Sequence, residues 1–230
     1  MMKKRNLAFL LGFLAAEGIL YWLILTTHGT TLVHAEYTAI VLCFLFALIS
    51  FRDPLLIGGL AFTVLADFCL VLCNPIQQLW GMVFFLGAQA CYAVKLHRQG
   101  LHPGWLIARV ALMVVSAVVA VVVLGENTDP LALVSLAYYV NLILNMICAF
   151  VRFRDNRLLA IGFLLFILCD TVIGLQVAAG GYLPIAEGSV LHKIIFMPFH
   201  LSWFFYLPSQ VLLCLSTVYP SKHPNPGTDN

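Results

Sequence analysis

Long apolar runs, separated by short polar or helix-breaking segments, make up most of this chain. A helix that crosses the hydrocarbon core of a bilayer needs about 20 mostly apolar residues, with a range of about 17 to 25. The runs that approach or reach this length cover residues 6–27, 35–50, 55–73, 76–94, 104–124, 131–151, 158–177 and 197–218. Helix-breaking residues gather in the gaps, as at Asn74-Pro75 and Gly180-Gly181. The pattern predicts an all-α, polytopic membrane helical bundle with eight transmembrane helices.

The composition favours the same class of protein. Apolar residues form 62% of the chain, charged residues form 10%, and the mean hydropathy is +0.99, whereas soluble domains carry about 25% charged residues. The net charge of +2 gives no reason to expect nucleic acid as a partner. The seven cysteines lie within or beside apolar runs, and no pair has metal-ligand spacing in a loop. We therefore expect no metal, no cofactor and no disulfide framework.

The positive charges indicate how the bundle is oriented. With eight helices, all but one of the 12 lysines and arginines fall on one side, and Lys193 alone falls on the other. Because Lys and Arg concentrate in cytoplasmic loops, we expect a multi-pass protein of the cell membrane with both termini in the cytoplasm. Arg109, inside the fifth run, is expected to extend its side chain to the cytoplasmic interface. Residues 1–219 form one predicted transmembrane domain, and residues 220–230, rich in Pro and polar residues, form a predicted disordered cytoplasmic tail.

Two aspartates interrupt the apolar runs at matching positions. Asp67 and Asp170 lie equally far from the start of the third and seventh runs, at a helix length of roughly 18 Å. Both positions are past the bilayer midplane, toward the outer leaflet. An ionisable group at this depth is costly, and it usually faces the bundle interior and marks a site. We therefore expect the two carboxyl groups to lie at equal depth and to share one site.

The sequence around the two aspartates repeats. The matching positions are Phe51-Arg52-Asp53 with Phe153-Arg154-Asp155, Tyr37 with Tyr139, Gly59 with Gly162, and Leu65 with Leu168. Four helices is an even number, so two copies would run in the same direction through the membrane. The pattern predicts a parallel internal repeat of helices 1–4 and 5–8, related by a pseudo-two-fold axis along the membrane normal.

Other polar side chains within the runs are candidates for binding a substrate. Those side chains are Glu17, Gln89, Tyr92, Asn141, His200, Tyr206 and Gln210. Residues three or four apart share a helix face, so Tyr138, Asn141 and Asn145 should lie on one face of the sixth helix. The alternative role of the amides is hydrogen bonding between helices. Glu17 would then pair with a polar neighbour, and His200 would be a packing or interfacial residue.

Several short motifs resemble those of the YhhN-like, lysoplasmalogenase family. These motifs are Leu65-Ala66-Asp67-Phe68-Cys69-Leu70, Gly87-Ala88-Gln89-Ala90-Cys91-Tyr92, Leu168-Cys169-Asp170, and Tyr206 with Gln210 and Ser216. The resemblance covers roughly residues 55–216. The chain has Ala66 and Cys169 before its acids, where the family tends to have Gly and Ser, and Gln89 where the family often has His. The resemblance implies an eight-helix enzyme that hydrolyses the vinyl ether bond of lysoplasmalogens and releases a fatty aldehyde.

The polar residues suit that chemistry. A vinyl ether is cleaved by protonation of its β-carbon, which leaves an oxocarbenium ion to which water adds. Removal from water favours the protonated form of a carboxylic acid, and a second carboxylate can stabilise the cation or activate water, as in glycosidases. One of Asp67 and Asp170 would be the acid, and the other would be the base or electrostatic stabiliser; the sequence leaves the order open. The polar candidates Gln89, Tyr92, Asn141, Tyr206 and Gln210 would orient water and the lipid head group.

Two other functions fit the same residues. Paired acids in a parallel repeat also occur in proton- or ion-coupled transporters and flippases, where they bind the coupling ion. A non-catalytic membrane protein could use both acids only to hold its helices together. Helices 3 and 7 lack the Pro or paired-Gly breaks of discontinuous transporter helices, except at Gly58-Gly59, which favours the hydrolase. The expected partners are the bilayer and a lipid or lysolipid substrate, and no feature indicates an oligomeric state.

Overall fold

The computed structural model describes residues 4–27, 30–50, 53–125, 128–179, 185–197 and 200–218, and their regular structure is entirely helical. The helices are α1 (Lys4–Thr26), α2 (Thr30–Ser50), α3 (Pro54–Asp67), α4 (Gln78–Arg98), α5 (Gly104–Leu124), α6 (Pro130–Val151), α7 (Arg157–Ala179), α8 (Val190–Ile195) and α9 (Leu201–Leu215). A π-helical segment, η1 (Phe68–Leu72), continues α3. Within the described part of the chain, seven helices are long and apolar enough to cross a membrane. The predicted all-α membrane bundle is confirmed at this level, and α9, with 15 residues, falls short of that length.

Asp-Pro pairs define where two of the central helices begin. The Oδ1 atom of Asp53 accepts hydrogen bonds from the backbone N–H groups of Leu55 and Leu56, at 3.1 and 3.2 Å. Asp129 accepts from the N–H of Ala132 at 2.6 Å in the same way. In both helices the following proline occupies the first turn, where its missing N–H costs nothing. These caps fix where α3 and α6 begin, and therefore how far along each helix its polar residues lie.

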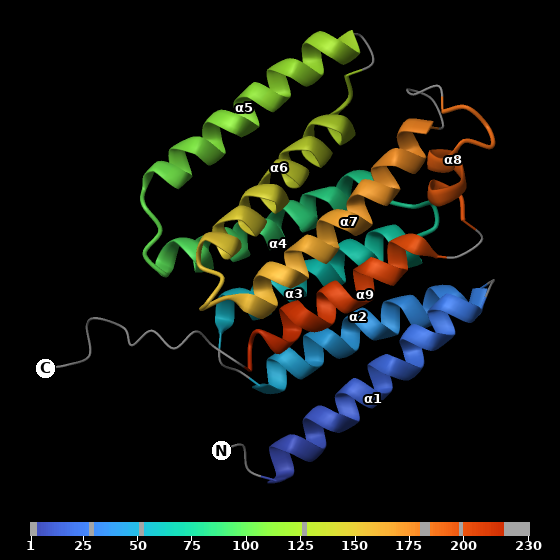
Figure 1. The fold of residues 1–230 in the computed structure, drawn as a ribbon, viewed down its shortest axis with the longest axis vertical. Helices are drawn as coiled ribbons and strands as arrows, with labels where there is room; N and C mark the ends of the chain where they lie inside the picture. Colours follow the sequence, from blue (N-terminus) through green and yellow to red (C-terminus); the bar gives the residue numbers. More distant parts are fainter. Residues whose placement is uncertain are drawn as a thin grey trace, which may run out of the picture.

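The helices form one bundle with α1 and α5 at opposite edges (Figure 1). Between these edges, α3 packs against α2 and α4, and α7 packs against α6 and α9. The contacts of α4 with α6 and of α2 with α9 join the two groups. The start of α1 and the end of α9 lie at the same end of the bundle (Figure 1). Large side chains that are fully buried, such as Tyr92, Phe163 and Phe166, fill the centre.

Several predicted boundaries differ from the observed ones. The helix predicted over residues 35–50 begins at Thr30, and the helix predicted to end at residue 94 continues to Arg98. The last predicted span, 197–218, corresponds to α9, which begins at Leu201. The short helix α8 and the π-helical turn after Asp67 were not predicted. The predicted tail, residues 220–230, lies outside the described residues.

Candidate functional site

Asp67 and Asp170 lie in α3 and α7, two of the central helices of the bundle. Asp67 is the last residue of α3, directly before η1, and its exposed fraction is only 3%. π-helical turns are rare and occur frequently at functional sites. Asp170 lies in the second half of α7 and is partly buried. The charge of Asp170 is close enough to act on Asp67, so the two carboxyl groups share one region of the bundle.

Each of these aspartates accepts a hydrogen bond from a tyrosine of another helix. The hydroxyl of Tyr206, on α9, donates to Oδ2 of Asp67 at 2.6 Å. The hydroxyl of Tyr138, on α6, donates to Oδ2 of Asp170. No hydrogen bond from a described residue reaches either Oδ1 atom. We call these the Asp67 pair and the Asp170 pair; in both of them one carboxyl oxygen accepts the hydrogen bond of a tyrosine.

Two phenylalanines connect the pairs. Phe85, on α4, contacts Tyr138 with ring centroids 5.4 Å apart and Tyr206 at 6.5 Å. Phe166, on α7, contacts Tyr206 at 5.4 Å and Tyr138 at 6.3 Å. The two phenyl rings also meet each other edge to face at 5.7 Å. This aromatic bridge, Phe85 and Phe166, makes the region between the acids apolar, which suits a hydrocarbon chain better than free water.

A third carboxyl group lies near Asp67 and was not predicted. Glu36, on α2, has an exposed fraction of 7%, and its charge acts on Asp67. The next residue, Tyr37, contacts Phe68 of η1 with ring centroids 6.2 Å apart. The sequence held a signal for this residue: Ala35-Glu36-Tyr37 resembles Ala137-Tyr138-Tyr139. Because Tyr138 touches Asp170, the repeat would have placed Glu36 beside Asp67.

A second polar group lies between α4, α5 and α6. Arg109 donates through Nη1 to Oδ1 of Asn141 at 2.5 Å and through Nη2 to Oδ1 of Asn145 at 2.8 Å. The Nδ2 of Asn145 donates to the side-chain and backbone oxygens of Gln89, both at 2.9 Å. We call Arg109, Asn141, Asn145 and Gln89 the Arg109 group. It contains two of the predicted substrate-binding residues, Gln89 and Asn141.

The position predicted for the Arg109 side chain was wrong. Arg109 does not extend to the interface, because its exposed fraction is 5% and its guanidinium points into the bundle. The physical reason lies on α6, where two amide oxygens one helical turn apart offer acceptors that a lipid-facing side chain would lack. The prediction that Asn141 and Asn145 share a face with Tyr138 agrees with these contacts.

Three other predicted site residues are buried away from the hydrogen bonds of the two pairs. The ring of Tyr92 packs on Gly59 and meets Phe163 at 5.4 Å. Gln210 donates to Ser209 at 3.2 Å. Glu17, on α1, accepts a weak hydrogen bond from the thiol of Cys43 at 3.5 Å. These contacts give the three residues a packing environment, and no described contact joins them to Asp67 or Asp170.

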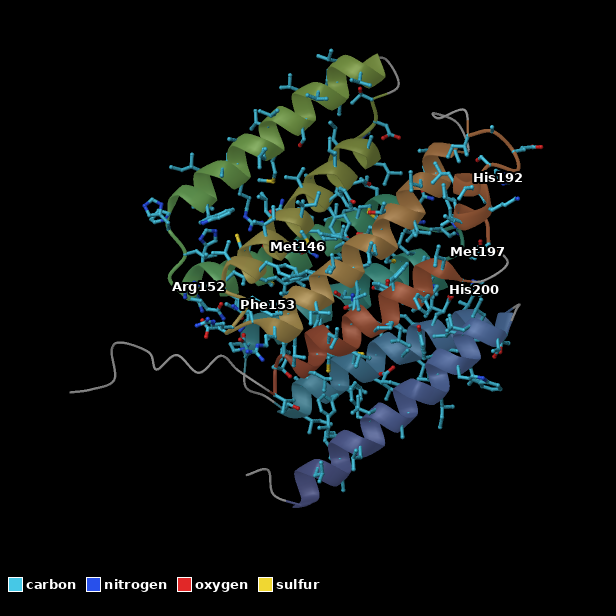
Figure 2. The ribbon with its side chains drawn as sticks, viewed as in Figure 1. Met146, Arg152, Phe153, His192, Met197 and His200 are labelled. Atoms are coloured by element: carbon cyan, nitrogen blue, oxygen red, sulfur yellow. The ribbon has the colours of Figure 1, made fainter. Side chains whose placement is uncertain are left out.

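His200 lies at one end of the bundle. Figure 2 shows it near His192 and Met197, at the end opposite Arg152 and Phe153. It occupies the N-cap position of α9 without a side-chain cap bond, about 9 Å of helix from Tyr206. Within the described residues, no group of three or more His, Cys, Asp or Glu side chains is placed to hold a metal ion. The groups that the two pairs themselves contain are carboxyl and phenol groups.

Comparison with known proteins gives one family. The model of the YhhN family matches residues 31–217. The matched region contains both aspartates, both tyrosines, the aromatic bridge, Glu36 and the Arg109 group. No curated protein and no solved structure matches the chain significantly.

Proposed function

Because the chain belongs to the YhhN family, we propose that it is a membrane hydrolase of the lysoplasmalogenase type. Its substrate would be the vinyl ether bond of a lysoplasmalogen or a related lysolipid. One observation carries the proposal: two carboxyl groups, each held by a tyrosine, flank the aromatic bridge. Acid-catalysed vinyl ether cleavage needs a proton donor, a stabiliser for a cation and an apolar place for the alkenyl chain, and this arrangement offers all three.

The surroundings favour Asp67 as the proton donor and Asp170 as the stabilising carboxylate. Asp67 is the more buried of the two, and it has Glu36 as a second carboxyl neighbour. Neighbouring negative charges repel, so a group in this position holds its proton more readily. Asp170 accepts from the phenol of Tyr138, whose ring contacts both phenylalanines of the aromatic bridge. Aromatic faces also attract a cation, so the Asp170 side suits the oxocarbenium ion.

The reaction then follows from these roles. Asp67 transfers its proton to the β-carbon of the vinyl ether, and the α-carbon becomes an oxocarbenium ion. A water molecule adds to the α-carbon while Asp170 takes one of its protons, which gives a hemiacetal. The Asp67 carboxylate then removes the hemiacetal hydroxyl proton as the bond to the glycerol oxygen breaks, and that oxygen takes the proton from Asp170. The products are a fatty aldehyde and a glycerophospho head group, and both acids return to their starting states.

We further propose the parallel repeat and the eight-span topology with both termini in the cytoplasm. Helix neighbours support the repeat, because α3 contacts α2 and α4 as α7 contacts α6 and α9. Gly59 lies against Tyr92 of α4, and Gly162 lies against Leu213 of α9, so matching glycines allow matching close approaches. In this scheme α9 is the eighth span. It also aligns Phe85-Leu86-Gly87-Ala88-Gln89 with Tyr206-Leu207-Pro208-Ser209-Gln210.

The test is aldehyde release by the purified protein in detergent. The substrate is a lysoplasmalogen, and the comparison compound is an ester lysolipid with the same head group and chain length. We expect aldehyde from the first and no fatty acid from the second. Asp67→Asn should remove the activity without lowering expression, whereas Glu187→Gln, an exposed acid far along the chain, should leave it unchanged. Absence of aldehyde from the wild-type protein would overturn the proposal, and ion-coupled flux in liposomes without product would favour the transporter.

A further inference from the structure

Arg109 is a buried cation, and no carboxylate among the described residues forms an ion pair with it. The ion pair seen within the described residues joins Lys95 and Asp53 and does not involve Arg109. The guanidinium group stays charged under all ordinary conditions. A charge removed from water without a counter-charge is costly, and in a membrane-spanning helix it indicates a functional site. The acids of the proposed reaction do not explain this residue, because no described contact joins it to them.

The Arg109 group also has buried polar atoms that no atom of the described residues satisfies. Within the described residues, Arg109 uses Nη1 and Nη2 for the two asparagines and has the Cys148 thiol nearby, but its Nε has no hydrogen-bond partner. The Nε2 amide of Gln89 is also buried without a partner. His97, on α4 beyond Gln89, lies close enough for the charge of Arg109 to act on it, and its Nε2 is buried and unpartnered as well. Buried polar atoms nearly always have partners, so three such atoms around one cation indicate a ligand that accepts hydrogen bonds.

We propose that the Arg109 group, with His97, binds the phosphate of a lysolipid head group. A phosphate supplies several acceptor oxygens and the negative charge that Arg109 lacks, and the planar guanidinium suits such an anion. The position fits a head group, because Arg109 lies near the start of α5, and α5 forms an outer edge of the bundle (Figure 1). The choice of a lysolipid rests on the proposed function, whereas the binding of an anion does not.

The spacing along α6 links this site to the Asp170 pair. Tyr138, Asn141 and Asn145 share one face of α6, and roughly 4.5 Å and 10 Å of helix rise separate Tyr138 from the two asparagines. In a lysoplasmalogen, the few bonds of the glycerol separate the vinyl ether oxygen from the phosphate. A head group held by Arg109 would therefore place the vinyl ether near Asp170, with the glycerol beside Asn141.

Binding of a lipid that cannot be hydrolysed tests this inference separately from catalysis. The probes are a 1-alkyl glycerophosphoethanolamine, whose saturated ether survives, the matching 1-alkylglycerol without phosphate, and inorganic phosphate. Each is titrated against the purified protein, its Arg109→Gln variant and an Arg98→Gln control, whose arginine is exposed. We expect Arg109→Gln to weaken the phospholipid at least about tenfold, which corresponds to about 1.4 kcal/mol, with no change for the alkylglycerol. Arg98→Gln should behave as the wild-type protein.

The outcomes separate the sources of the anion. Competition by inorganic phosphate at Arg109 would mean a free-phosphate site, and its absence would mean recognition of the whole head group. Equal phospholipid binding by wild-type and Arg109→Gln protein would overturn the inference, as would an equal loss of alkylglycerol binding. If Arg109→Gln does not fold, Arg109→Lys is used, because lysine keeps the positive charge but lacks the planar guanidinium group. Unchanged phospholipid binding by Arg109→Lys would also overturn the inference. Failure of vinyl ether cleavage with intact phosphate binding would count against the proposed reaction alone.

Discussion

Asp67 and Asp170 each accept a hydrogen bond from a tyrosine, but the two tyrosines lie at different positions of the proposed repeat. In the proposed repeat, Tyr206 corresponds to Phe85, and Tyr138 corresponds to Glu36. In that repeat, two matching positions lie near the acids, one on the helix before each acid and one on the last helix of the other repeat unit. Asp67 has Glu36 nearby and accepts from the phenol of Tyr206, whereas Asp170 accepts from the phenol of Tyr138, and Phe85 contacts that phenol ring.

If the proposed repeat holds, this exchange of neighbours would give two matching acids different surroundings. A general acid and a stabilising carboxylate need different surroundings, because one must carry a proton and the other must carry charge. A repeat that stayed symmetrical would give both groups the same properties. Under the proposed repeat, different residues at two positions, on α2 and α4, would distinguish the acids, while α3 and α7 would hold them at matching places.

The largest expected effect comes from the acids themselves. Asp67→Asn and Asp170→Asn should each lower aldehyde release by at least about 10²-fold, the low end of what general acid–base groups contribute. Since both groups act in one reaction, the double variant should be no slower than the slower single variant. Rates of aldehyde release, with protein yield and thermal unfolding as controls, check this. Two losses that multiply would mean that the acids act independently and would contradict a shared site.

The two tyrosines should separate the roles of the acids. A hydrogen bond to a charged group contributes about 1.5–3 kcal/mol and a neutral one about 0.5–1.5 kcal/mol. If Asp170 carries the charge, Tyr138→Phe should lower kcat roughly 10- to 100-fold, and Tyr206→Phe roughly 2- to 10-fold. Both changes keep the ring that contacts the aromatic bridge. The reverse order of the two effects would assign the proton donor to Asp170 instead.

Glu36→Gln should have a smaller effect, confined to the Asp67 side. The amide keeps the size of the side chain but removes the negative charge that acts on Asp67. We expect kcat to fall a few-fold, up to about tenfold, since roughly 1.4 kcal/mol corresponds to a factor of ten. Combining this change with Asp67→Asn should add nothing, whereas combining it with Tyr138→Phe should multiply the effects. If Glu36→Gln lowers the activity of the Asp67→Asn variant as much as it lowers that of the wild-type protein, Glu36 does not act through Asp67.

The helices and the two acids were accessible from the sequence, because apolar length and isolated charges are local features. The residues that contact the acids were harder to predict from the sequence. Glu36 lies at the edge of the helix predicted over residues 35–50, where an acid suggests the membrane interface; α2 in fact begins at Thr30, more than a turn earlier. Arg109 was assigned to the interface because the sequence does not say which face of α5 meets α6. The first error thus concerns where a helix begins, and the second concerns which side of a helix faces its neighbours.

The glycines Gly59 and Gly162 give the smallest and most structural test of the comparison. A Cβ on Gly59 would lie 2.3 Å from the ring of Tyr92, whereas a Cβ on Gly162 would lie 3.0 Å from the end of Leu213. Overpacking of this kind costs about 1–3 kcal/mol. Gly59→Ala should therefore lower the thermal unfolding temperature in detergent more than Gly162→Ala, since an aromatic ring held in the core moves less easily than a leucine.

Another glycine in each of the same two helices, α3 and α7, provides a matched control for each change. A Cβ on Gly58 meets the Cys91 sulfur at an ordinary 3.6 Å, and one on Gly174 meets nothing within 4 Å. Gly58→Ala and Gly174→Ala should be neutral or slightly stabilising, because Ala favours a helix over Gly by up to about 1 kcal/mol. If all four variants unfold at the same temperature, the close approach of α3 to α4 and of α7 to α9 is not what these glycines provide. The support that the proposed repeat draws from their matched positions would then be lost, while the two tyrosine bonds to the acids would still have to be explained.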